Sequence, residues 1–190
     1  MIGEDLVSIA LESNAAQAAI LDTSIIQFHE EFRKACEKNV CRKFDTNWMG
    51  PPAIGPISEL KQRVLRYPHG LLFQSTHSVA SNFDMKGMLE GAKVHALIFR
   101  DLLKKIRDRY PSEELLPLDA GCCSICDRCA YLDAEPCRNP DIAASSVEAY
   151  GMNVIALQKS AGVPYYYGKT TVCYVGLILF GAAGDPASRS

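Results

Sequence analysis

Five cysteines lie within one short stretch of this chain, and their spacing is that of a metal-ligand loop. They are Cys122, Cys123, Cys126, Cys129 and, after seven further residues, Cys137. From Cys123 onwards the first three ligands are separated by two residues, so a turning backbone can direct successive thiolates at one centre. A more distant cysteine then completes four-fold ligation, as in ferredoxin-type loops. Thiolates are soft ligands that select iron–sulfur clusters or zinc over hard cations.

The spacing favours a [4Fe-4S] cluster bound by Cys123, Cys126, Cys129 and Cys137. Cys122 is the spare, because Cys123 preserves both two-residue gaps. The main alternative is a structural zinc module. A four-cysteine zinc site usually pairs two C-x-x-C knuckles across a longer linker, whereas here three cysteines follow one another. A third hypothesis is an enzyme with an open iron, which requires Cys137 to lie apart or the N-terminal cysteines to supply part of a second site.

The remaining cysteines give weaker signals. Cys36 and Cys41, together with the spare Cys122, are further candidate metal ligands, although two thiolates alone cannot hold a cluster. Cys173 lies in an apolar stretch and is expected to be a small core residue. Trp48, beside the Gly50-Pro51-Pro52 turn, is expected to be a core anchor or to cover a site.

No rival active site is visible. A Gly-rich phosphate loop, a G-x-S-x-G elbow and paired catalytic carboxylates are all missing from the sequence. The four histidines, His29, His69, His77 and His95, show no ligand spacing. No catalytic residue is therefore assigned, and an enzymatic role stays open beside electron transfer or service to a redox enzyme.

Composition restricts the partners and the compartment. The 190 residues are 48% hydrophobic and carry a net charge of −2 without a basic stripe, so neither nucleic acid nor a membrane is an expected partner. The first residues are acidic and precede no apolar signal segment. We therefore expect a cytoplasmic protein, in which clustered cysteines bind metal or act in catalysis rather than form disulfides. An unidentified redox protein and a second copy of the chain are the expected partners.

The elements that must position these cysteines alternate between strands and helices. Apolar runs predict strands at 16–22, 70–76, 115–119 and 170–180, with 24–32 as a strand or helical turn and 36–52 as a loop. Helical spacing and capping residues predict helices at 4–13, from Pro56, at 84–109, after Ser145 or Ser146, and after Asn153. In the long helix, a stripe from Met85 through Leu89 to Ile106 is expected to face the core.

This order predicts an α/β or α+β fold with a mixed sheet of about four to five strands and flanking helices. We expect a single domain over residues 1–182, with the cysteine-rich loop at 121–140, and a disordered tail at 183–190.

The second half of the chain resembles the family of predicted metal-binding proteins DUF2284. Members read like G-P-C-x-x-C-x-x-C, then P-C-R-x-P, then A-R-P-S-M-E-A-x-G-I-D-V, then an apolar strand. This chain has Gly121-Cys122-Cys123-Ser124-Ile125-Cys126-Asp127-Arg128-Cys129, then Pro136-Cys137-Arg138-Asn139-Pro140, a related segment at 143–154, and the strand at 172–180. The resemblance implies a metal-binding and iron–sulfur protein, with no particular reaction.

The chain also departs from the family pattern at two places. The family's N-terminal motif resembles C-x4-C-x8-C-P-P, but Gly50 stands where its third cysteine belongs. A metal site on Cys36 and Cys41 is therefore incomplete or needs a borrowed ligand. Ala144 and Ser145 replace an Arg-Pro pair, so no anion contact by that arginine carries over.

Overall fold

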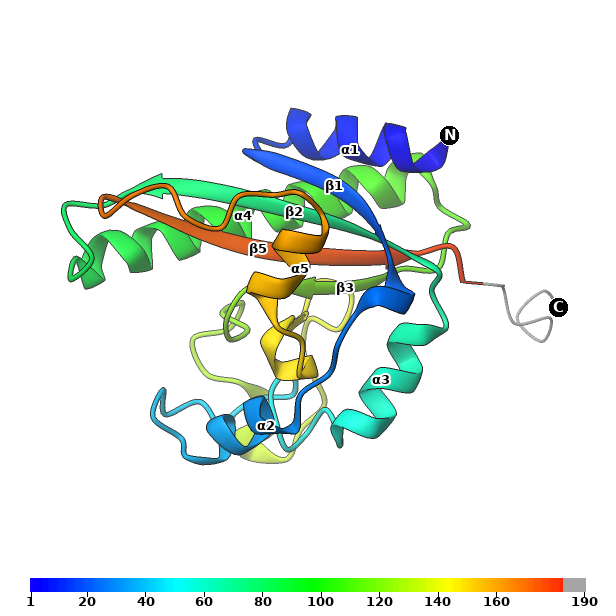
Figure 1. The fold of residues 1–190 in the computed structure, drawn as a ribbon. Coiled ribbons are helices and arrows are strands. Elements are labelled where there is room, and N and C mark those ends of the chain that lie inside the picture. Colours follow the sequence, from blue (N-terminus) through cyan, green and yellow to red (C-terminus); the bar gives the residue numbers. More distant parts are fainter. Residues whose placement is uncertain (183–190) are drawn as a thin grey trace, which may run out of the picture.

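A five-stranded mixed sheet forms the centre of the fold (Figure 1). The structure is a computed structural model that describes residues 1–182, so the expected tail at 183–190 lies outside the described residues. In spatial order the strands are β1 (Gln17–Asp22), β2 (His69–Ser78), β5 (Thr171–Phe180), β3 (Leu116–Asp119) and β4 (Ser145–Ser146). Neighbouring strands are antiparallel, except that β3 and β4 are parallel.

Helices cover both faces of this sheet. The helices are α1 (Ile2–Glu12), α2 (Glu30–Glu37), α3 (Ile57–Leu65), α4 (Met85–Arg109) and α5 (Val154–Ser160). Residues of α1 and α4 pack on one face of the sheet, and residues of α3 and α5 pack on the other. Three short 3-10 turns complete the description: η1 (Thr23–Ile25), η2 (Ala130–Asp133) and η3 (Glu148–Tyr150). The predicted mixture of sheet and flanking helices is confirmed.

The central strand β5 explains how the two cores share one sheet. Side chains alternate across a strand, so Leu177 and Leu179 join the cluster under α3 and α5, whereas Ile178 and Phe180 join the cluster under α1 and α4. All four are essentially inaccessible to solvent. A strand buried on both faces reads as a continuous apolar run, which is why this element could be predicted from the sequence.

The long helix α4 differs from its prediction in its first half. Met85 and Leu89 of the expected stripe are 65% and 60% exposed. The helix instead buries Gly91 and His95, since Gly91 fits against the His77 ring and His95 bonds to Ser75. A glycine contact and a polar contact carry no apolar periodicity, so the first half of the predicted stripe is wrong. In the second half, Phe99, Leu102, Leu103 and Ile106 are buried as predicted. Among residues 1–182, no helix is long and apolar enough to cross a membrane.

Three other local predictions need correction. Cys173 is only partly buried, because residues 171–174 of β5 are half exposed. Cys36 was expected to begin a loop but lies in α2. This helix has no buried residue and therefore no apolar stripe that could have predicted it. Ser145 and Ser146 form β4 rather than only capping a helix. The Ser146 hydroxyl nevertheless accepts a hydrogen bond from the Ala149 amide, at 3.1 Å, where η3 begins.

Gly176 in β5 provides a test of how the sheet packs against α4. It is paired with Phe73 of β2, and a Cβ atom at position 176 would lie 2.3 Å from the Phe73 ring. That ring is fully buried and stacks between His95 and Phe99. We predict that Gly176→Ala lowers the free energy of unfolding by about 1–3 kcal/mol, because the added methyl group overpacks the core and must displace the Phe73 ring or the backbone.

Urea denaturation followed by circular dichroism measures this loss. Cys173→Ala, three residues earlier in the same strand and partly exposed, is the control and should leave the midpoint nearly unchanged. Equal midpoints for Gly176→Ala and the unmodified chain would contradict the packing described for Phe73.

Candidate metal centre

The cysteine-rich segment is the crossover between the two parallel strands β3 and β4. A parallel connection needs a dozen or more residues and usually contains a helix. Here residues 120–144 make the crossover with only the 3-10 turn η2. The segment leaves β3 through Gly121, whose positive φ of 70° suits a residue without a side chain. The cysteines thus lie on a long irregular loop at the edge strand of the sheet.

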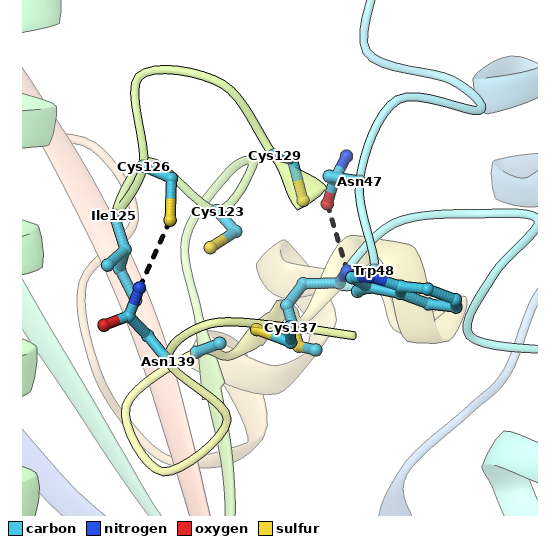
Figure 2. A pocket seen from close by; sticks show the side chains of 10 residues that line it. Asn47, Trp48, Cys123, Ile125, Cys126, Cys129, Cys137 and Asn139 are labelled. Carbon is cyan, nitrogen blue, oxygen red and sulfur yellow. Dashed lines mark hydrogen bonds between the residues drawn. The ribbon is translucent and has the colours of Figure 1, made fainter. Parts of the chain in front are cut away.

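Four cysteines of this loop line one small cavity (Figure 2). They are Cys123, Cys126, Cys129 and Cys137, the four ligands expected from the spacing. Their sulfur atoms point into the space between the loop and the segment that carries Cys137. Asn47, Trp48 and Met49 complete the wall from a loop more than seventy residues earlier. The structure therefore brings the four predicted residues together.

The cavity is chemically matched to a soft metal but has little room. Its lining has four thiols and no carboxylate or imidazole, a donor set that selects soft metals. Its volume is about 20 Å³, the space of a single water molecule. Within residues 1–182, no three His, Cys, Asp or Glu side chains converge closely enough to hold one metal ion. Binding therefore requires the side chains of the irregular loop to shift.

Two local effects act on the thiols. Burial raises the pKa of Cys123 above that of a free thiol, so its proton must be displaced when a metal binds. The Asn139 amide Nδ2 donates a hydrogen bond to Cys126 Sγ at 3.2 Å (Figure 2). A hydrogen-bond donor at a ligand sulfur is a typical partner of a metal-bound thiolate. Asn139 was not predicted as a site residue, although it directly follows the Pro136-Cys137-Arg138 motif.

Trp48 fastens the cysteine loop to the N-terminal loop. Its indole Nε1 donates to the Glu135 carbonyl at 2.8 Å, and its ring meets Tyr131 edge-on with centroids 4.9 Å apart. The Tyr131 hydroxyl also donates to the carboxylate of Asp45. These contacts close one wall of the four-cysteine cavity. Trp48 is only partly buried and lines this cavity, so it is not the core anchor that was one of its two expected roles.

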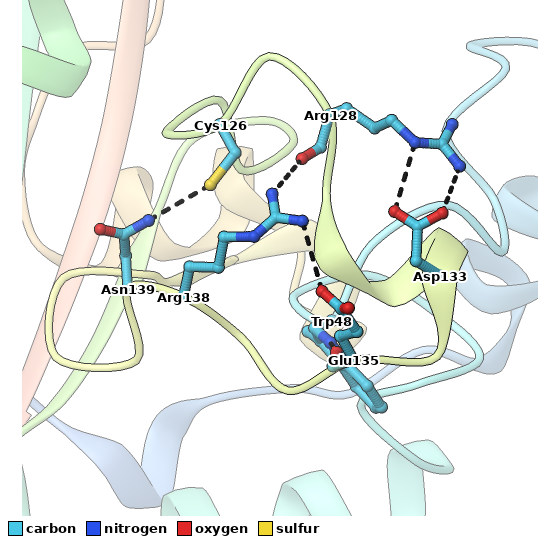
Figure 3. Close-up of polar contacts among 7 residues, drawn as sticks. All are labelled: Trp48, Cys126, Arg128, Asp133, Glu135, Arg138 and Asn139. Carbon is cyan, nitrogen blue, oxygen red and sulfur yellow. Dashed lines mark hydrogen bonds and ion pairs between the residues drawn. The ribbon is translucent and has the colours of Figure 1, made fainter.

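The two arginines beside the cysteines make ion pairs of their own (Figure 3). Arg128 pairs with Asp133 at 2.7 Å, and Arg138 lies 3.6 Å from Glu135 while donating to the Arg128 carbonyl at 3.1 Å. The carboxylate of Asp133 therefore has its pKa lowered by the Arg128 hydrogen bond. Because each guanidinium has an acidic partner, the arginines hold the loop's shape and add little net positive charge at the cysteines.

The remaining candidate cysteines gather elsewhere. Cys36, Cys41 and Cys122 line a second, larger cavity of about 250 Å³, and Gly50 lies on its wall. Cys122 thus faces away from the cavity that its neighbour Cys123 lines. Cys173 lines neither cavity. Its thiol lies 3.3 Å from the Tyr165 carbonyl.

A buried polar network lies beneath the start of the cysteine loop, and sequence reasoning missed it. The Ser75 hydroxyl lies 2.7 Å from His95 Nδ1 and 2.8 Å from His77 Nε2. His95 Nε2 is 3.3 Å from Asp119, the last residue of β3, without hydrogen-bond geometry. Ser75 and His95 are only 2% and 1% exposed. These are the residue types of a nucleophilic triad, but their burial keeps substrates away and indicates a structural role.

The fold and the thiol-lined cavities define a cysteine-rich α+β protein with the donor set of a metal-binding protein. The model of the DUF2284 family, described as a predicted metal-binding protein, matches residues 19–180. The chain belongs to this family. The match begins at β1, earlier than the motifs that carry the resemblance in the sequence. Neither a curated protein nor a solved structure matches the chain.

The Trp48 contact generates a prediction for the loops. Trp48→Phe retains an aromatic ring against Tyr131 but removes the donor to Glu135, so we expect the free energy of unfolding to fall by about 0.5–1.5 kcal/mol. Hydrogen exchange should accelerate in residues 130–139 more than in the sheet. Urea denaturation followed by circular dichroism and exchange mass spectrometry provide the two measurements. Tyr165→Phe, at an exposed position, is the control, and unchanged exchange in Trp48→Phe would contradict a fastening role.

Proposed function

We propose that the protein binds a [4Fe-4S] cluster through Cys123, Cys126, Cys129 and Cys137 and passes electrons to or from a redox partner. The observation that carries the proposal is that Cys137 lines the same cavity as the three closely spaced cysteines. An electron-transfer cluster needs four thiolates around one body. The open-iron hypothesis with a distant Cys137 is correspondingly less well supported.

The spacing of the cysteines supports a cluster over a single zinc ion, because three of them follow one another at two-residue gaps instead of forming two separate C-x-x-C pairs. Four sulfur atoms around zinc must each lie about 2.3 Å from one point. In a cubane each thiolate binds a different iron, so the sulfur atoms surround a larger body and need not meet. The cavity that the four thiols line has a volume of about 20 Å³, so a cluster must displace part of its walls. The irregular, half-exposed loop can open around it without disturbing the sheet.

The surroundings of the cavity fit a redox role better than a hydrolytic one. The amide of Asn139 is the polar group that contacts a ligand sulfur, and hydrogen bonds to sulfur are a means of tuning reduction potential. The cluster would supply one-electron transfer when bound, while Trp48 and Met49 shield it on one side. Such a protein belongs in a reducing compartment such as the cytoplasm, with a redox partner to receive the electron.

Metal analysis of protein purified without oxygen tests the proposal. We predict about four irons and four acid-labile sulfides at this site, with visible absorption that bleaches on reduction. Cys126→Ala should lose this set, whereas Cys173→Ala, the control outside both cavities, should keep it. Stoichiometric zinc without sulfide would establish the structural zinc module instead. Protein that binds no iron under these conditions would sink the proposal.

The Asn139 hydrogen bond makes a finer prediction. The hydrogen bond from Asn139 to Cys126 Sγ would stabilise the reduced cluster, which is the more negatively charged state. Asn139→Ala removes this bond, so the midpoint potential should become more negative. Loss of such an outer partner should also weaken metal binding by about 10–100-fold. Protein-film voltammetry gives the potential. Ile125→Val, on the same wall without a polar group, is the control, and an unchanged potential in Asn139→Ala would rule out this tuning role.

A further inference from the structure

A second group of thiols lies beside the first, and the proposed cluster does not use it. Cys36 comes from the end of α2, Cys41 from the loop that follows, and Cys122 from the crossover after β3. Although Cys122 is far from the other two in sequence, all three line the larger cavity. Core packing does not explain why these three cysteines line one cavity, because each is at least partly exposed.

Cys122 supplies the third thiol of this cavity, because the chain has Gly50 where the family pattern has a cysteine. Position 50 faces the same cavity but is a glycine. A Cβ atom there would lie 2.9 Å from the Asn47 amide, and Asn47 is buried and holds its own turn by accepting a hydrogen bond from the Met49 amide at 3.1 Å. Asn47 therefore occupies the space that a side chain at position 50 would need. Cys122 brings a thiol to this cavity from the opposite loop.

The other groups near the cavity suit a negatively charged, thiolate-bound centre. Lys43 lies on the wall of this cavity, and Arg33, three residues before Cys36 on α2, is a second nearby cation. Arg33 also donates to the carbonyls of Gly55 and Ala149, at 2.9 and 3.3 Å, which ties α2 to the segments beneath it.

Glu148 is the single carboxylate among the lining residues. It lies in η3, directly before Ala149, whose carbonyl Arg33 holds. Its carboxylate would be an oxygen ligand beside three thiols, whereas the first site has thiols alone. The second site would thus have one metal position without a cysteine.

We propose that Cys36, Cys41 and Cys122 bind a second iron–sulfur cluster, with Glu148 as the one oxygen donor beside it. The cavity is more than ten times larger than the four-cysteine cavity, which leaves room for a polynuclear body. The adjacent residues Cys122 and Cys123 serve different cavities, and Asn47 and Met49 line both. The two clusters are therefore neighbours separated by one layer of side chains. This site is independent of the ligand set proposed above.

Iron and sulfide counts on anaerobically reconstituted full-length chain test this second site. The unmodified protein should bind about eight irons and eight sulfides, as two [4Fe-4S] clusters. Cys122→Ala should retain about four of each, and Cys126→Ala should retain the other four. Cys173→Ala should retain all. Cys36→Ala should give the same counts as Cys122→Ala. If Cys36→Ala does not fold, Cys122→Ala, at an exposed position, still tests the second site.

Alkylation of the loaded protein supplies a readout without metal counting. Loading should protect Cys36, Cys41 and Cys122 from iodoacetamide in both the unmodified chain and Cys126→Ala, as mapped by mass spectrometry. The proposal fails if the unmodified protein binds about four irons and Cys122→Ala binds as many. It also fails if the second site takes zinc without sulfide. If the unmodified protein binds no cluster at Cys123, Cys126, Cys129 and Cys137 while Cys36, Cys41 and Cys122 are still protected, the proposed function is refuted and the second site is supported.

Discussion

Both thiol-lined cavities depend on the contact between two irregular loops that meet at Trp48. The loop after α2 and the crossover after β3 have no regular structure to hold them together. Their connection is the indole hydrogen bond to Glu135, the edge-on contact with Tyr131, and the Tyr131–Asp45 hydrogen bond. Asn47 and Met49, on either side of Trp48 in the chain, line both cavities. The sheet supplies the anchor points of the loops, but a handful of side chains determines where the cysteines face.

Much of the scaffold could be predicted from the sequence, because its signals are local. β5 reads as an apolar run since it is buried on both faces, α3 shows helical spacing at Ile57, Leu60 and Val64, and Asn153 caps α5 through its side chain. The predictions that failed concern residues whose contacts are distant in sequence. The first half of α4 is buried through Gly91 and His95, whose contacts come from β2. The spacing of apolar residues cannot predict the contact of Gly91 with the His77 ring.

The site shows the same division. Spacing alone grouped Cys123, Cys126, Cys129 and Cys137, because a two-residue gap constrains where thiolates can point, and the structure places all four on one cavity. Spacing could not show that Cys122 faces Cys36 and Cys41 instead, since that depends on how two loops fold over each other. Nor could it identify Asn139 as a partner of Cys126. The family match accounts for metal binding in general, and the side chains around each thiol carry the finer proposals.

The parallel pairing of β3 with the two-residue β4 has a consequence for how the protein would fail. In most folds a helix makes such a crossover and supports itself, but here the connection is a cysteine-bearing loop at the margin of the sheet. Oxidation of those thiols would strike this margin first and release a short edge strand. The β1–β2–β5 platform would outlast it, since its ladder is long and its two hydrophobic clusters do not involve the thiols. Damage by air would therefore look like local fraying long before it looked like unfolding.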